Sequence, residues 1–250
     1  MSAVGELPDF TGSVALVTGA SRGVGRAVAA AFAAAGAQVV AAARTREALE
    51  ELAAQAGPRC IPFACDLTQA QDVMRLSAFV RERWGRLDAL VGNAAIMGRR
   101  AGVAELEESD WLGVMDANVT ANWRLIRAFD ALLRAAPAGR AVFMTSGNGS
   151  RARMAPRRGA YAISKAALDA LARSYASETQ DSAVRVMLCN PGPLRTAMRA
   201  QAAPEEDPAT LRTPEDFAPS MLALCAPAWT HTGLLYDFAT DRLLEFGAPG

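Results

Sequence analysis

Short apolar runs alternate with longer amphipathic stretches along almost the whole chain, and this alternation restricts the folds that it can adopt. Apolar runs of this kind are typical of strands that are buried on both faces, and the stretches between them have helical spacing. Strands are predicted at residues 14–18, 38–43, 60–64, 89–92, 141–145, 184–190 and 234–238, and helices at 23–35, 46–55, 70–84, 108–136, 159–179 and 214–224. The alternation predicts an α/β fold with one parallel sheet of about seven strands and helices on both faces.

The composition indicates one globular domain over residues 1–250, because 51% of the residues are hydrophobic and the chain is long enough to bury a two-sided core. The 26 basic residues equal the 26 acidic ones in number, so we expect no nucleic-acid partner. No apolar run could span a bilayer and no secretion signal is present, so we expect no membrane partner and a cytoplasmic location. Residues 195–213, polar and rich in proline, are predicted to form a mobile loop beside the substrate.

The cysteines argue against a metal centre or a redox pair. Cys60, Cys65, Cys189 and Cys225 form no C-x-x-C pair and show no metal-ligand spacing. We therefore expect four buried free thiols and no bound metal.

A glycine-rich turn, T-G-A-S-R-G-V-G at residues 18–25, directly follows the first predicted strand and opens a helix. Glycine at positions 19, 23 and 25 permits a tight turn, close approach of phosphate and close packing of helix on strand. The N–H groups of the helix N-terminus could then hold a pyrophosphate. A simple strand-to-helix connection is the alternative. Placed after the first strand, the turn indicates a dinucleotide site in a Rossmann-like, doubly wound sheet.

The end of the second predicted strand indicates which dinucleotide binds. An NAD site carries an acidic side chain there, but this strand ends in Arg44. Arg44 and Arg22 could together bind a 2′-phosphate, which predicts NADP(H) as the cofactor. Two solvated surface arginines are the alternative reading.

A tyrosine and a lysine are spaced for proton-transfer chemistry in Y-A-I-S-K, residues 161–165. Tyr161 and Lys165 stand one helical turn apart, and Lys165 is the only lysine among 26 basic residues. An ammonium near a phenol is expected to lower the pKa of the phenol from about 10 toward neutrality. Ser146, in M-T-S-G-N-G after the fifth predicted strand, precedes this pair.

With these motifs in place, the chain resembles the classical short-chain dehydrogenase/reductase family over nearly its whole length. The resemblance implies a catalytic tetrad of Asn118, Ser146, Tyr161 and Lys165. It implies a cofactor site formed by Thr18, Gly19, Ser21, Arg22, Gly23, Val24, Gly25, Arg44, Asp66, Leu67, Asn93, Ala94, Tyr161, Lys165, Pro191, Gly192, Leu194 and Thr196. The C-terminal part also resembles a bacterial subgroup, the YciK-type proteins, which implies no particular substrate.

The implied activity is an NADP(H)-dependent interconversion of a small-molecule carbonyl and a secondary alcohol. Tyr161 would act as general acid or base, Ser146 would bond the carbonyl oxygen, Lys165 would hold the nicotinamide ribose and Asn118 would anchor a water in a proton relay. The family also implies a homodimer or homotetramer built from the helices at 108–136 and 159–179.

Two departures from the family pattern matter. The usual N-N-A-G reads G-N-A-A at residues 92–95, which predicts weaker local bonding beneath the cofactor but not lost binding. The segment before Tyr161 is long, so Asn148 or Ser150 are alternatives to Ser146.

Other functions remain possible at this point. A non-catalytic NADP-binding sensor or scaffold is the alternative to an enzyme. Arginines at 151, 153, 157, 158, 195 and 199 suggest an anionic substrate such as an acyl thioester, although solvated arginines are the simpler account.

Overall fold

The structure is a computed structural model that describes residues 8–147 and 157–246. Within them, eight strands form one sheet in the order β3-β2-β1-β4-β5-β6-β7-β8. All neighbouring strands are parallel except β7 and β8. The strands are β1 (Val14–Thr18), β2 (Gln38–Ala43), β3 (Cys60–Ala64), β4 (Ala89–Gly92), β5 (Arg140–Met144), β6 (Arg185–Asn190), β7 (Leu235–Asp237) and β8 (Arg242–Leu244). This order confirms the predicted doubly wound, Rossmann-like fold.

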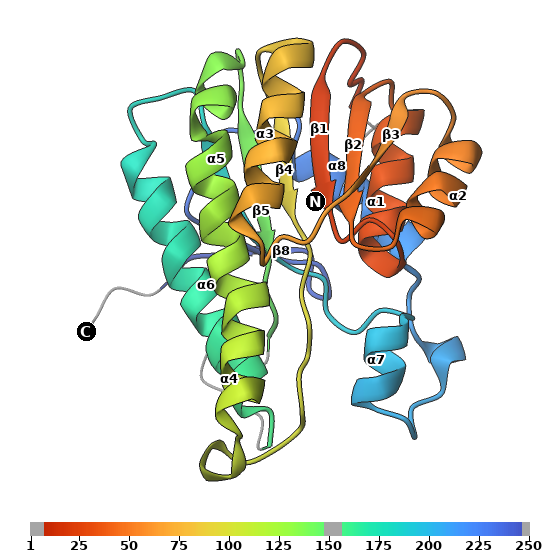
Figure 1. Cartoon of the computed structure of the whole chain (residues 1–250), viewed down its shortest axis with the longest axis vertical. Helices are drawn as coiled ribbons and strands as arrows, with labels where there is room; N and C mark the ends of the chain where they lie inside the picture. Colours follow the sequence, from red (N-terminus) through yellow and green to blue (C-terminus); the bar gives the residue numbers. More distant parts are fainter. Residues whose placement is uncertain (1–7, 148–156, 247–250) are drawn as a thin grey trace.

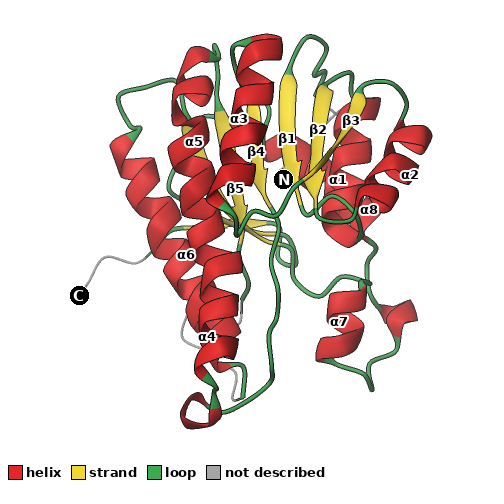
Figure 2. Cartoon of the chain, viewed as in Figure 1, coloured by secondary structure: helices red, strands yellow, loops and turns green. Residues whose placement is uncertain are grey.

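Helices cover both faces of the sheet, as Figures 1 and 2 show. The α-helices are α1 (Gly23–Ala34), α2 (Arg46–Ala56), α3 (Ala70–Trp84), α4 (Glu108–Met115), α5 (Ala121–Ala135), α6 (Gly159–Glu178), α7 (Ala197–Ala202) and α8 (Pro214–Leu224). Alternate residues of β1 enter two separate cores. Val17 packs in the core with α1, α2 and α8, whereas Leu16 packs in the core with α3, α5 and α6. Strands apolar on both faces are what a two-sided parallel sheet requires.

The helix predicted over 108–136 is interrupted. A single π-helical turn, Asp116–Thr120, lies between α4 and α5. The insertion turns the side chain of Asn118 into the interior, where it bonds the backbone of Ile96. A helical pattern in the sequence could not show this, because the bonds that stabilise the π-turn come from a distant segment.

Two smaller differences lie near the C-terminal end. β8 was not predicted, because a three-residue antiparallel strand has too short an apolar pattern to recognise. The segment expected to be a loop at 195–213 contains α7 and a 3-10 turn, Pro208–Thr210. Thr196 caps α7 by accepting a hydrogen bond from the backbone N–H of Arg199, a local signal that the sequence did contain. Mobility of this segment stays a prediction.

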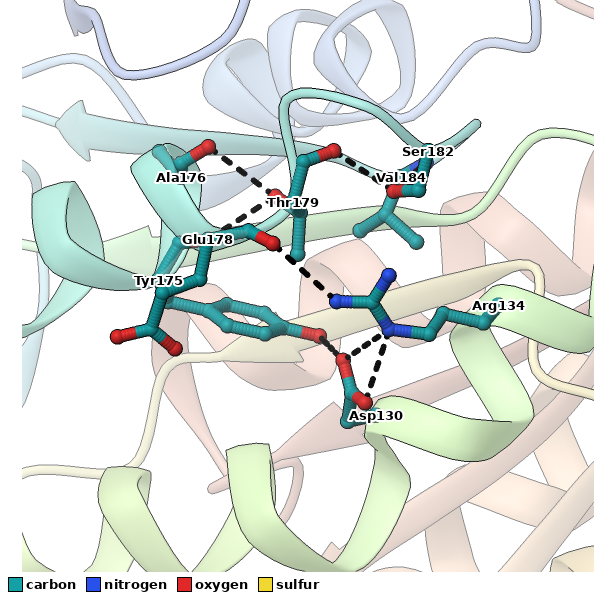
Figure 3. A network of polar contacts seen from close by, with 8 residues as sticks. All are labelled: Asp130, Arg134, Tyr175, Ala176, Glu178, Thr179, Ser182 and Val184. Carbon is teal, nitrogen blue, oxygen red and sulfur yellow. Dashed lines mark hydrogen bonds and ion pairs between the residues drawn. The ribbon is translucent and has the colours of Figure 1, made fainter.

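The far end of α6 is fixed to α5 by the polar network in Figure 3. Tyr175 donates its hydroxyl proton to Asp130 at 2.8 Å, and Arg134 donates to the same carboxylate at 2.9 Å. Thr179 and Ser182 continue the network to the start of β6. Because α6 also carries Tyr161 and Lys165, this network holds the helix on which both residues stand.

Two composition-based expectations can be compared with the structure. All four cysteines are buried and free, as predicted. Of the helices in the described part of the chain, none is both long and apolar enough to cross a membrane.

Candidate functional site

A cavity of about 970 Å³ opens at the carboxyl ends of the strands, where the connections from β1 and β4 run in opposite directions. It brings together most of the residues that the sequence predicted. Those lining it are Gly19, Ser21, Arg22, Gly23, Val24, Arg44, Asp66, Leu67, Asn93, Ala94, Ser146, Tyr161, Lys165, Pro191, Gly192, Leu194 and Thr196. The other three predicted residues, Thr18, Gly25 and Asn118, are buried and do not line the cavity.

The glycine-rich turn needs its glycines for identifiable reasons. Gly19 and Gly23 have φ angles of 66° and 55°, a region that disfavours side chains. A Cβ on Gly19 would also lie 2.9 Å from Nδ2 of Asn93, and one on Gly25 would overlap the carbonyl oxygen of Gly19. The missing side chains therefore let the turn pack closely on itself and on Asn93, while Gly19 and Gly23 line the cavity.

The turn is fastened to β4 by Thr18 and Asn93. The hydroxyl of Thr18 donates to the carbonyl of Val91 at 3.1 Å and accepts from the backbone N–H of Asn93 at 3.0 Å. The side-chain amide of Asn93 donates to the carbonyl of Thr18 at 2.8 Å. These bonds span adjacent strands, so they fix the loops on either side of the cavity floor relative to one another.

Packing explains why glycine replaces the family's usual asparagine at position 92. A Cβ at this position would lie 2.5 Å from Oδ1 of Asn122 and 2.5 Å from Cδ1 of Phe143. The space that a larger residue would need is thus occupied by an amide from α5 and a ring from β5. Asn93 keeps its bonds, so the expected weakening of local bonding is not seen at that residue.

One end of the cavity carries the residues predicted to select the dinucleotide. Arg22 and Arg44 are both exposed at its edge, and among the described residues neither side chain forms an ion pair. Asp66 accepts from the backbone N–H of Thr68 at 3.0 Å and from its hydroxyl at 2.8 Å. Two uncommitted cations with no acidic side chain at the end of β2 form a site suited to an anionic group.

Lys165 is buried beneath the cavity. Its ammonium donates to the carbonyl of Met144 at 2.7 Å and lies 5.8 Å from the centroid of the Tyr161 ring. Burial lowers the pKa of Lys165 to about 8, although the charge of the buried Asp169, one turn further along α6, raises it. The lysine therefore carries its proton at neutral pH.

The pKa of Tyr161 differs from the expectation. Burial raises it above the ordinary value, while a hydrogen bond with Ser146 and the positive charge of Arg158 lower it. The prediction that Lys165 brings the pKa of Tyr161 toward neutrality is therefore wrong for this structure. Desolvation outweighs the attraction of nearby positive charge, of which Arg158 is the cation that lowers this pKa.

Asn118 has a structural role in this geometry. Its Nδ2 donates to the carbonyl of Ile96 at 2.9 Å and to the hydroxyl of Ser164 at 2.9 Å, and its Oδ1 accepts from the N–H of Ile96 at 2.8 Å. Ser164 in turn donates to the carbonyl of Tyr161 at 2.7 Å. Both donors and the acceptor of this amide are used by protein groups, so its side chain ties the π-turn to α6.

Some predicted residues cannot be placed. Asn148 and Ser150, the alternatives to Ser146, lie outside the described residues, as do Arg151 and Arg153. Ser146 is described, lines the cavity and bonds Tyr161, which favours it as the serine of the site.

Asn190, which lines the cavity, was missed by sequence reasoning. Asn190 accepts from the backbone N–H of Gly192 at 3.2 Å and donates to Asp237 at 3.1 Å, so it shapes the loop after β6. Its place before Pro-Gly at the end of a strand was the available signal. Arg158, which the sequence analysis named among six arginines that suggest an anionic substrate, lines the cavity one turn before Tyr161.

A doubly wound sheet, a glycine turn at its switch point and a Ser–Tyr–Lys group in the same cavity define a dinucleotide-binding oxidoreductase architecture. The family model for short chain dehydrogenases matches residues 13–207. The chain belongs to the short-chain dehydrogenase family, whose members are oxidoreductases.

The comparisons also confirm the resemblance to the YciK-type subgroup. The oxidoreductase YciK of Escherichia coli K12 is 36% identical over 92% of this chain and 92% of its own length. A short-chain dehydrogenase from Shigella flexneri, crystallised with NADP, superposes with a TM-score of 0.87 at 34% identity and covers 94% of this chain and 100% of its own. One from Escherichia coli CFT073, crystallised with NADPH, gives a TM-score of 0.86 at 34% identity over 94% of this chain and 99% of its own.

Proposed function

We propose that this protein is an NADP(H)-dependent oxidoreductase that interconverts a carbonyl group and a secondary alcohol. One observation carries the proposal: Ser146, Tyr161 and Lys165 line the same cavity as the glycine-rich turn. A proton donor and a dinucleotide site must share a cavity for hydride and proton to reach one substrate.

The residues fit NADP(H). Gly19 and Gly23 line the cavity at the N-terminus of α1, where backbone N–H groups can hold a pyrophosphate, and Arg22 and Arg44 offer uncommitted charge for a 2′-phosphate. Neighbours of 34% identity that were crystallised with NADP or NADPH support the same choice. Asp66 and Leu67 would contact the adenine end, and Thr196 the nicotinamide end.

When bound, the cofactor would supply or accept the hydride. In reduction, Tyr161 would donate its hydroxyl proton to the carbonyl oxygen of the substrate, and Ser146 would donate a hydrogen bond to that oxygen as negative charge develops on it. Lys165 would hold the ribose hydroxyls with its ammonium. Asn118 would position α6 through Ser164.

The raised pKa of Tyr161 fits the role of a proton donor in reduction. A phenol whose pKa lies above its ordinary value keeps its proton at neutral pH, which is the form that a proton donor needs. The opposite reaction needs the phenolate, so oxidation should require a higher pH than reduction.

A panel of aldehydes and ketones mixed with NADPH or NADH tests the proposal, with loss of the reduced cofactor as the measurement. We expect turnover with at least one carbonyl compound and a preference for NADPH. Equal use of NADH would contradict the role of the two arginines. Tight NADPH binding with no turnover of any compound would support the sensor alternative instead.

We also propose a homo-oligomer. Leu112 and Trp123, on α4 and α5, are 56% and 45% exposed, which is unusual for large apolar side chains. A second copy of the chain packed on these helices would cover them. Light scattering that returned the 26.3 kDa of a single chain at micromolar concentration would contradict this assembly.

A further inference from the structure

Arg158 lines the cavity, and its charge acts on Tyr161. It is the residue directly before α6, one helical turn ahead of Tyr161, and its side chain is half-buried. Its guanidinium donates to the carbonyl of Ala202 at 3.2 Å and contacts the sulfur of Met97 at 3.7 Å. Among the described residues, the five N–H donors of this side chain are matched by one backbone carbonyl and one weak sulfur acceptor.

Two neighbouring arginines, Arg157 and Arg199, are each paired with a carboxylate. Arg157 pairs with Glu105 at 3.1 Å, and Arg199 forms two 2.6 Å hydrogen bonds with Glu206. Within residues 8–147 and 157–246, no carboxylate forms an ion pair with Arg158. A half-buried cation without an anionic partner is costly, since desolvation is not offset by a counter-charge.

A second arginine increases the positive charge at this place. Arg100 donates to the same carbonyl of Ala202 at 3.1 Å, so two guanidinium groups share one acceptor at the end of α7. Burial and the positive charges of Arg100 and Arg199 lower the pKa of Arg158. The lowered pKa is a consequence of the same excess of positive charge around this guanidinium. An anion entering here would meet donors that the protein leaves largely unused.

We propose that Arg158 is the anion-binding residue of the substrate site, and that the substrate is a carbonyl compound carrying a carboxylate or a phosphate. This rests on the proposed function, because the carbonyl must face Tyr161 while the anionic group contacts Arg158. A planar guanidinium binds either anion through two parallel hydrogen bonds. Arg158, directly before the helix that presents the proton donor, would thereby select the substrate.

Binding can be measured without turnover. Isothermal titration of the protein–NADP complex with benzoate, phenyl phosphate and neutral benzamide separates the two anions from their uncharged analogue. We expect Arg158→Gln to weaken binding of the preferred anion by about tenfold or more, the effect of losing a charged hydrogen bond. Benzamide binding should not change.

Arg157→Gln is the matched control, because Arg157 is adjacent, exposed and already paired with Glu105. It should leave anion binding unchanged. Arg158→Lys keeps the charge but not the two parallel bonds, so it should lie between wild type and Arg158→Gln. Unchanged anion binding in a folded Arg158→Gln protein would overturn the proposal, as would an equal loss in Arg157→Gln.

Matched substrates give the second measurement. The value of kcat/KM for 4-formylbenzoate should fall about tenfold in Arg158→Gln, while that for its uncharged methyl ester should change little. An equal fall for both would show that Arg158 acts only through Tyr161, and would overturn the proposal. If no aldehyde is reduced, the proposed function fails, yet the titrations still decide whether Arg158 binds anions.

Discussion

The two sides of the cavity are built in different ways. On the dinucleotide side, Thr18 and Asn93 bond each other's backbones across adjacent parallel strands, without any charged group. On the opposite side, α7 lies apart from both helical layers (Figure 1) and is held by arginine side chains that bond the carbonyl of Ala202.

This difference indicates which contacts of the cavity are fixed by the sheet and which can be exchanged. Bonds between buried neighbouring strands break only if the sheet opens, whereas contacts of partly exposed arginines contribute little to stability and are easily exchanged. We therefore expect the dinucleotide side to be the more rigid one, and substrate selection to change on the α7 side at little cost to the fold. Tyr161 and Lys165, the proposed catalytic residues, stand on α6, which packs in the core against the sheet.

The largest effect should come from removing the proton donor. Tyr161→Phe keeps the ring but not the hydroxyl, so reduction of any accepted carbonyl should slow by about a hundredfold to ten-thousandfold. NADPH affinity should change little, which fluorescence titration would check. A variant that kept wild-type turnover would mean that the chemistry does not belong to α6.

Lys165→Arg tests whether shape or charge matters in the buried part of the site. The larger, planar guanidinium cannot replace a compact ammonium that bonds Met144, so activity should fall by about a hundredfold or more, or about 2.7 kcal/mol of barrier. Circular dichroism should show an intact fold. Near wild-type turnover in this folded variant would contradict the assignment.

Arg44→Asp tests the open end of the dinucleotide side. The carboxylate would repel a 2′-phosphate but could accept from a ribose hydroxyl, so the Kd of NADPH should rise by about tenfold or more while that of NADH changes less. Arg46→Asp is a suitable control, because Arg46 is exposed on α2 and absent from the cavity lining. Equal losses for both cofactors would argue against phosphate recognition by Arg44.

The smallest effect is expected at Asp169. Because the pKa of Lys165 is about 8, NADPH affinity should decrease as the pH rises through that value and the ammonium is lost. Asp169→Asn removes a charge that raises this pKa, so the decrease should begin at lower pH, with a change of less than about tenfold in affinity at neutral pH. Superimposable pH profiles for the two proteins would exclude this role.

Local signals were enough to predict much of the fold and of the site. β1 and the glycine turn were recognisable because a buried strand, three glycines and a helix follow one another within one short segment. Tyr161 and Lys165 were recognisable from their spacing on one helix. β8 and the capped α7 were missed because each is too short for a periodic pattern.

The sequence by itself determined the succession of strands and helices along the chain, the dinucleotide turn and the one-turn spacing of Tyr161 and Lys165. Each of these depends on residues that are close together in the chain. The tertiary structure decided three other things: the π-turn at Asn118, the raised pKa of Tyr161 and the choice of Arg158 among many arginines. Each depends on which distant groups exclude water or supply a partner. Burial and pairing are properties of the folded chain, so spacing along the sequence cannot show them.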